Sequence, residues 1–431
     1  MPAATLSSVP DSNAPASVPA RPARIISIDA LRGLVMFTMI YVNDIAGVPG
    51  TIVPPWMKHF HGKSGMTFVD LVFPAFLFIV GMSIPFGLGS RLSKGEPLWK
   101  IILHVAVRTL SLLFIGILMV NETPSSEKMG WSGALWATLM YFSAILAFCT
   151  ISPPQKPATA ASRMRTFRVV SLVLRLLGLA TLVYLAFAFR GEDGHRIISL
   201  DPFSIHTEWY GILGLIGWAY LVGALVFLVF RGHRTAVLCS AVLLLCLYPA
   251  DQHGAFNSFW LARYVGIGGT LGSQAAITVA GLLLATILVA PDTGTVWRRT
   301  RFTLLFIAGS AAGAWLLHGL YGINKNSATP SWCLWACAIT ATVWLIFYFL
   351  ADVTPLGFIA RPFAIAGQNV FLAYLISEML PSAIDLLHLD NWYGGLAGPN
   401  LAHAVARSAG CALVILCLTA ALNRVGFRLK L

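Results

Sequence analysis

Long apolar runs separated by short polar segments are the dominant pattern along this chain of 431 residues. A helix needs about 20 mainly apolar residues to cross a bilayer. Segments of that kind lie near residues 31–49, 68–89, 101–120, 132–151, 169–189, 210–230, 235–250, 273–291, 302–321, 332–351, 362–382 and 402–423. We therefore predict an all-α, polytopic transmembrane helical bundle of about 11–12 spans, in which segment 235–250 is the weakest.

Composition agrees with this pattern and leaves little room for a soluble domain. Hydrophobic residues make up 57% of the chain and charged residues 11%, whereas a soluble protein carries about 25% charged residues. The mean hydropathy is +0.77. We predict a single transmembrane domain over residues 25–431, preceded by a disordered cytoplasmic tail over residues 1–24, which is rich in Pro, Ala and Ser.

The net charge of +12 follows from the distribution of basic residues between the two sides of the membrane. Alternate loops hold most of the lysines and arginines, whereas most of the acids lie in the other loops. Since cytoplasmic loops carry the excess of Lys and Arg, the pattern predicts a cytoplasmic N-terminus. It also makes the lipid bilayer the expected partner and excludes nucleic acid.

Cysteine usage gives no metal or disulfide signal. All seven cysteines fall inside predicted spans, and no His or acid joins them at ligand spacing. We interpret them as small packing residues, and we predict no metal site.

The polar loop after the first span holds the strongest candidate chemistry. His59 and His61 stand between Lys58 and Lys63, and Asp70 opens the next apolar run. An ionisable group at the membrane is costly and indicates function, and histidine moves protons near neutral pH. The alternative is a hydrated loop in which Asp70 only caps the following helix.

Further polar groups interrupt the apolar segments. Asp29 and Arg32 are three residues apart, a spacing that allows an ion pair on one helix face. By the count of spans, the loop with His59 and the loop after the ninth span share the extracytoplasmic side. Such a face could supply a base and oxyanion donors for acyl transfer. The other polar groups are Asn43, Asn324, Lys325, Asn326, Asn369 and Glu378.

These motifs together resemble the heparan-α-glucosaminide N-acetyltransferase family, in a bacterial, DUF5009-like branch. The matching pieces are residues 27–33, Lys58-His59, residues 65–74 with Asp70-Leu71-Val72-Phe73-Pro74, Asn324-Lys325-Asn326, and Gly367-Gln368-Asn369 with Tyr374 and Glu378. The resemblance implies a multi-helix bundle that takes acetyl from cytosolic acetyl-CoA. The acetyl group would pass to the amino group, or a hydroxyl group, of a sugar or glycan acceptor outside. It also implies a multi-pass protein of the bacterial inner membrane.

The resemblance also assigns roles to residues. His59 would be the general base or a transient acyl carrier, oriented by Asp70. Relatives have five residues from this histidine to the glycine, whereas His59 and Gly65 are six apart, so His61 competes for the role. Acceptor or acyl contacts are expected from Asn43, Asn324, Lys325, Asn326, Asn369 and Glu378. Candidates for acetyl-CoA contacts are Asp29, Arg32, Arg298, Arg299 and Arg361.

One departure from the family bears on the substrate. Relatives often carry two arginines at the start of the fourth span, where this chain has residues 130–137 without an arginine. Two other functions stay open: a proton-coupled secondary transporter, in which the His and Asp residues relay protons, and an inactive scaffold of the same fold. A homodimer is also left open.

Overall fold

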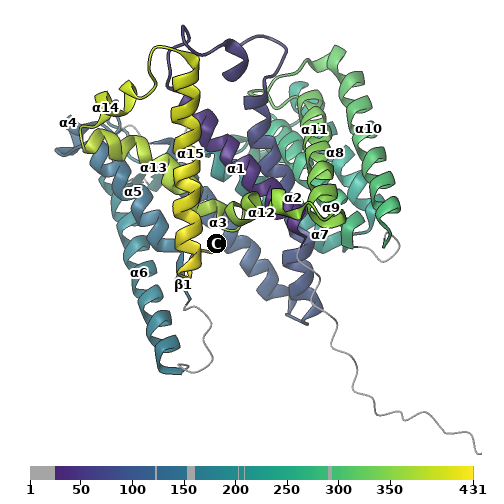
Figure 1. Cartoon of the computed structure of the whole chain (residues 1–431), viewed down its shortest axis with the longest axis horizontal. Coiled ribbons are helices and arrows are strands. Elements are labelled where there is room, and N and C mark those ends of the chain that lie inside the picture. Colours follow the sequence, from purple (N-terminus) through teal and green to yellow (C-terminus); the bar gives the residue numbers. More distant parts are fainter. Residues whose placement is uncertain are drawn as a thin grey trace, which may run out of the picture.

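The computed structural model is a bundle of long helices (Figure 1). It describes residues 25–121, 124–152, 161–201, 203–207, 209–289 and 294–430. The tail predicted at residues 1–24 lies outside this range. The fold class predicted from the apolar runs is confirmed.

The first half of the chain, as far as Ala188, has helices and one short strand in its described residues. Its elements are α1 (Ile26–Ala46), η1 (Pro55–Met57), η2 (Phe68–Leu71), α2 (Val72–Ser93), α3 (Leu98–Val120), α4 (Ser126–Met129), α5 (Gly133–Phe148), β1 (Cys149–Ile151) and α6 (Ala161–Ala188).

The second half continues with helices, two of which are extended by π-helical turns. Its elements are β2 (Ile198–Leu200), β3 (Phe203–Ile205), α7 (Gly211–Phe230), α8 (Arg234–Gln252), η3 (Trp260–Arg263), η4 (Ile267–Gln274), α9 (Ala275–Val289), α10 (Val296–Tyr321), α11 (Pro330–Tyr348), η6 (Phe349–Val353), α12 (Gly357–Ala366), α13 (Val370–Leu386), α14 (Asp390–Gly395), α15 (Leu401–Arg424) and β4 (Phe427–Leu429). Short antiparallel pairs join β1 to β4 and β2 to β3.

Ten helices within the described residues are long and apolar enough to cross a membrane. The weakest predicted segment is among them as α8. The segment predicted at 362–382 is instead a broken element, because α12 and α13 meet at a bend of 61° and together give an eleventh candidate span. The segment predicted at 132–151 forms α5, which has 16 residues.

Contacts between loops indicate that the short helix α5 also crosses. The Gly65 N–H donates to the Ile323 carbonyl at 2.9 Å, so the loop before α2 and the loop after α10 lie on one side of the molecule (Figure 1). An even number of crossings must separate them. The described α-helices of at least 15 residues between them are α2, α3, α5, α6, α7, α8, α9 and α10. With the other seven crossing, α5 must cross as well, and 16 residues give about 24 Å of helix.

Glycines set the closest helix contacts in the core. A Cβ atom on Gly81 of α2 would lie 1.8 Å from the Thr278 carbonyl oxygen, and one on Gly281 of α9 would lie 2.0 Å from that of Phe78. Gly33 of α1 and Gly367 have the same relation across α1 and α12. Small residues let membrane helices approach closely. These contacts fix α1 and α2, the two helices that flank the histidine loop.

Candidate functional site

Asp70 organises the histidine loop from the start of η2. Its side chain is 3% exposed, and its Oδ1 lies 2.8 Å from His59 Nδ1. The other oxygen, Oδ2, accepts the backbone N–H of Phe60 at 3.1 Å and that of Thr67 at 3.0 Å. An acid that accepts the N–H three residues before it is half of a capping box. Asp70 therefore both caps the helix start and holds the imidazole.

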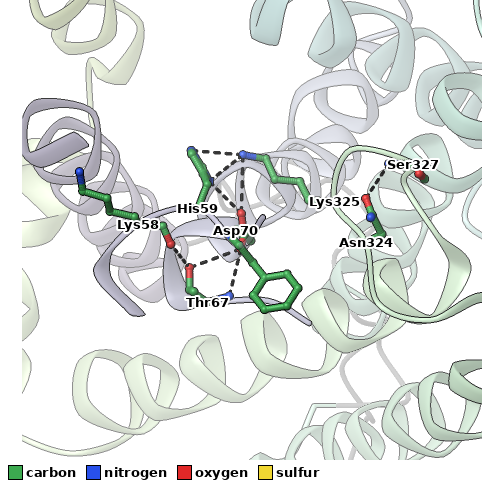
Figure 2. Close-up of polar contacts among 8 residues, drawn as sticks. Lys58, His59, Thr67, Asp70, Asn324, Lys325 and Ser327 are labelled. Atoms are coloured by element: carbon green, nitrogen blue, oxygen red, sulfur yellow. Dashed lines mark hydrogen bonds and ion pairs between the residues drawn. The ribbon is translucent and has the colours of Figure 1, made fainter. Parts of the chain in front are cut away.

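A lysine from a distant loop completes this cluster, as Figure 2 shows. Lys325 Nζ lies 3.2 Å from His59 Nδ1, 3.5 Å from Nε2 and 4.0 Å from Asp70 Oδ1. The two loops are tied further by the Ile323 N–H, which donates to Ser64 Oγ at 3.0 Å. The loops after the first and ninth spans, for which the count of spans predicts the same side of the membrane, are therefore in contact.

The hydrogen bonds of the cluster orient the His59 imidazole. Since the Asp70 carboxylate is the acceptor facing Nδ1, Nδ1 carries a proton, and the neutral tautomer with this hydrogen bond has its lone pair on Nε2. Burial lowers the pKa of Lys325, and the charge of Asp70 opposes that shift. His59 is open to a substrate, because its side chain is 43% exposed.

The neighbouring candidates in these loops are placed differently. Asn324 Oδ1 accepts the Ser327 N–H at 3.0 Å (Figure 2), so this amide shapes its own loop. Asn326 and His61 are exposed, and within the described residues neither makes a hydrogen bond or an ion pair. His59, rather than His61, is therefore the histidine that meets Asp70.

A second polar group of residues surrounds a cavity of about 900 Å³ between α1, α5, α13, α14 and α15. Asn43 and Glu378 line it, and Asn43 Nδ2 donates to Glu378 Oε1 at 2.9 Å. Residues 130–137 contribute Gly133, Ala134 and Ala137 to the lining. The lining does not include His59, Asp70 or Lys325.

The wall of this cavity contains an ion pair that the sequence did not predict. Arg407 of α15 lies 3.0 Å from the Asp44 carboxylate, and the two side chains are 9% and 11% exposed. Tyr393 donates to Asp44 at 2.6 Å, and Ser408 donates to it as well. Burial, together with Asp44, raises the pKa of the Tyr393 phenol. The available signal was an arginine inside an apolar run, which indicates a buried partner.

The candidates for acetyl-CoA contacts lie at the opposite end of the molecule from His59. Asp29 and Arg32 form the predicted ion pair at 2.8 Å, and Arg32 also donates to Ser83 at 2.6 Å. Arg32 and Asn43 are eleven residues apart on α1, which is about 16 Å along the helix axis.

The arginines of α10 and α12 lie at that same end. Arg298 and Arg299 begin α10, whose other end leads to Lys325. Arg299 lies 3.4 Å from the Tyr348 hydroxyl. Arg298 and Arg361 are exposed.

Asn369 has a structural position at the break between α12 and α13. Its Nδ2 donates to the Phe427 carbonyl at 3.3 Å, and its Oδ1 accepts the Leu429 N–H at 3.2 Å. Both polar atoms of this buried amide are thus engaged by β4. No group of His, Cys, Asp and Glu suited to a metal ion occurs in the part of the chain that the structure describes.

Comparison with known proteins identifies relatives over part of the chain. Residues 24–201 match the model of a family described as a domain of unknown function, DUF5009. Heparan-alpha-glucosaminide N-acetyltransferase of Homo sapiens is 33% identical over 112 residues, which are 26% of this chain and 16% of that protein. The Mus musculus protein of that name is 32% identical over 108 residues, 25% of this chain and 16% of that protein. The matched part of the chain thus spans about a sixth of the length of these curated relatives.

Proposed function

We propose that this chain is an integral-membrane acyltransferase. The proposal starts from two similarities: residues 24–201 match the DUF5009 family model, and 112 residues are 33% identical to heparan-alpha-glucosaminide N-acetyltransferase of Homo sapiens. The enzyme moves an acetyl group from acetyl-CoA on the cytosolic side to an amino, or hydroxyl, group of a sugar on the other side. The protein is multi-pass and resides in a bacterial inner membrane. The observation that carries the proposal is the cluster of His59, Asp70 and Lys325.

The geometry of this cluster suits a base assisted by a cation. Asp70 holds Nδ1–H of the imidazole, which leaves Nε2 to take the proton that the acceptor nitrogen loses as it attacks the thioester carbonyl. A C–N bond forms, the C–S bond breaks, and CoA leaves as a thiolate that accepts the proton from His59. The Lys325 ammonium, 3.2 Å from the imidazole, stabilises the negative charge that develops on the carbonyl oxygen.

A two-step route uses the same atoms. His59 Nε2 attacks the thioester carbonyl itself, the C–S bond breaks, and the acetyl group rests on the imidazole until the acceptor nitrogen takes it. In either route the donor approaches from the end of the bundle that carries Asp29, Arg32, Arg298, Arg299 and Arg361. Cationic side chains there would bind the CoA phosphates.

Acetyl transfer by purified protein tests this function. Wild type, His59→Ala and His61→Ala are incubated with radiolabelled acetyl-CoA and glucosamine, and acetylated product is counted. We expect transfer by wild type and by His61→Ala, and a loss of at least about 100-fold in His59→Ala. The exposed His61 is the matched control, since both substitutions remove an imidazole from one loop.

Two outcomes contradict the proposal. Equal activity of the two variants removes His59 from the reaction. An absence of transfer to any amine or hydroxyl acceptor, together with proton-coupled solute flux in proteoliposomes, makes the protein a transporter. To distinguish the two routes, the protein is incubated with radiolabelled acetyl-CoA without an acceptor and then isolated. Only the two-step route leaves label on His59.

A further inference from the structure

The cavity beside the end of α1 has the size and lining of a ligand site. Its volume of about 900 Å³ lies in the range of small-molecule sites. Ser382 and Asn43 contribute polar side chains to its lining, while Ile40 and Leu380 supply apolar surface. Alternating polar and apolar surface of this kind suits a ligand with many hydroxyl groups.

The charge of the lining is negative. Asp44, Glu378, Asp385 and Asp390 contribute carboxylates, whereas Arg407 is the one lysine or arginine in the lining formed by described residues. Asp44 already pairs with Arg407 at 3.0 Å. The exposed carboxylates of Asp385 and Asp390 therefore give the cavity a field that attracts cations and repels anions.

The cavity is tied to the loop that carries His59. Gly47 lines the cavity, and the next residue, Val48, accepts a hydrogen bond from Lys58 Nζ at 2.7 Å. Lys58 directly precedes His59. Because His59 and Lys325 lie outside the lining, a ligand that fills the cavity must extend beyond it to reach the imidazole.

We propose that this cavity is an extended acceptor subsite for an oligosaccharide that carries several free amino groups. The proposal rests on the acyltransferase function proposed above. Protonated amines of the oligosaccharide pair with Asp385 and Asp390, and its hydroxyl groups bond to Asn43 and Ser382. The end of the oligosaccharide extends beyond the cavity to His59, where its terminal amine loses a proton and is acetylated. A sulfated oligosaccharide is rejected by the same carboxylates.

Chain-length dependence of acetyl transfer tests the subsite. Glucosamine and its β-linked oligomers of two to four units are compared as acceptors, with a 6-O-sulfated tetramer as the counterpart in which a sulfate offsets the charge of each amine. We expect KM to fall about tenfold from monomer to tetramer, a gain typical of one or two added charge pairs. The sulfated tetramer should lose that gain.

A double variant, Asp385→Asn with Asp390→Asn, connects this effect to the cavity. Both residues are exposed, so their replacement leaves packing intact. We expect KM for the tetramer to rise about fivefold, with a smaller change for the monomer. Asp201→Asn is the matched control, because Asp201 is an exposed acid outside the lining. This variant should keep the wild-type ratio of monomer KM to tetramer KM.

Failure of the subsite is distinguishable from failure of the function. If acetyl transfer occurs, two results overturn the subsite. One is an equal KM for all chain lengths, and the other is an equal ratio of monomer KM to tetramer KM in wild type and the double variant. If no acceptor is acetylated, binding decides: the tetramer alone should raise the Tm of wild type more than that of the double variant. Equal Tm shifts overturn the subsite in that case.

Discussion

At the scale of single residues, Asp70 fits both roles that the sequence allowed, a helix cap and a partner of a histidine. It caps the start of η2 through the Thr67 N–H, as the alternative of a simple loop requires, and it also binds His59 Nδ1 at 2.8 Å. One buried carboxylate can do both because its two oxygens have different partners. Lys325 belongs to the same unit, although 266 residues separate it from His59.

Asp70→Asn separates the two roles of this carboxylate. The amide oxygen can still accept the Thr67 N–H and keep the cap, but the side chain no longer supplies a negative charge to stabilise an imidazolium. We expect kcat to fall about 100-fold, with a Tm within a few degrees of wild type, measured by acetyl transfer and thermal unfolding. Activity within twofold of wild type contradicts the role of Asp70.

Lys325→Arg tests the part that the cation plays. Because burial lowers the pKa of Lys325, its ammonium loses its proton at a lower pH than a free lysine, and transfer should decline there as pH rises. Arginine stays protonated throughout. We therefore expect the alkaline limb of kcat/KM against pH to move to higher pH in Lys325→Arg. An unchanged alkaline limb would mean that another group sets it.

At the scale of helices, close glycine contacts hold the site's scaffold together. The pair of Gly81 and Gly281 brings the backbones of α2 and α9 into contact, and that of Gly33 and Gly367 does so for α1 and α12. The break between α12 and α13 places Asn369 against β4 rather than along a passage. The sequence shows that these glycines are small and that Asn369 is polar, but it does not show which residues they contact.

Gly81→Ala should destabilise the α2–α9 contact. The added Cβ would lie 1.8 Å from the Thr278 carbonyl oxygen, so the helices must move apart, at a cost of about 1–3 kcal/mol. Gly87→Ala is the matched control in the same helix, since no atom lies within 4 Å of its Cβ. We expect a lower Tm in detergent for Gly81→Ala and not for Gly87→Ala. Equal Tm values contradict the close approach.

At the scale of the whole molecule, the bundle separates two polar ends. His59, Lys325 and the cavity occupy one end, and Arg32 and Arg298 occupy the other. The distribution of basic residues predicts that the end with Arg32 faces the cytoplasm. An acyl group moved between the two ends would cross the membrane in one reaction.

Thiol labelling of intact cells checks this orientation. In a variant without the seven native cysteines, one new cysteine is placed at either end, as Asp201→Cys or as Lys94→Cys, both at exposed positions. We expect a membrane-impermeant maleimide to label Asp201→Cys, whereas Lys94→Cys should react only after the cells are lysed. The reverse result inverts the predicted topology and places His59 in the cytoplasm.

The length of the apolar runs by itself determined the fold class. A segment in the bilayer must be long enough to cross it and must satisfy its backbone hydrogen bonds internally, and a helix of about 20 apolar residues does both. Counting spans also predicted that the loops of His59 and Lys325 lie on one side of the bundle, and the structure brings these two residues into contact. Only the tertiary structure decided that His59 rather than His61 faces Asp70, that Asp44 pairs with Arg407, and that Asn369 binds β4. These pairings join residues that are distant in sequence or depend on loop conformation. Helix packing and loop geometry set them, and neither follows from local residue pattern.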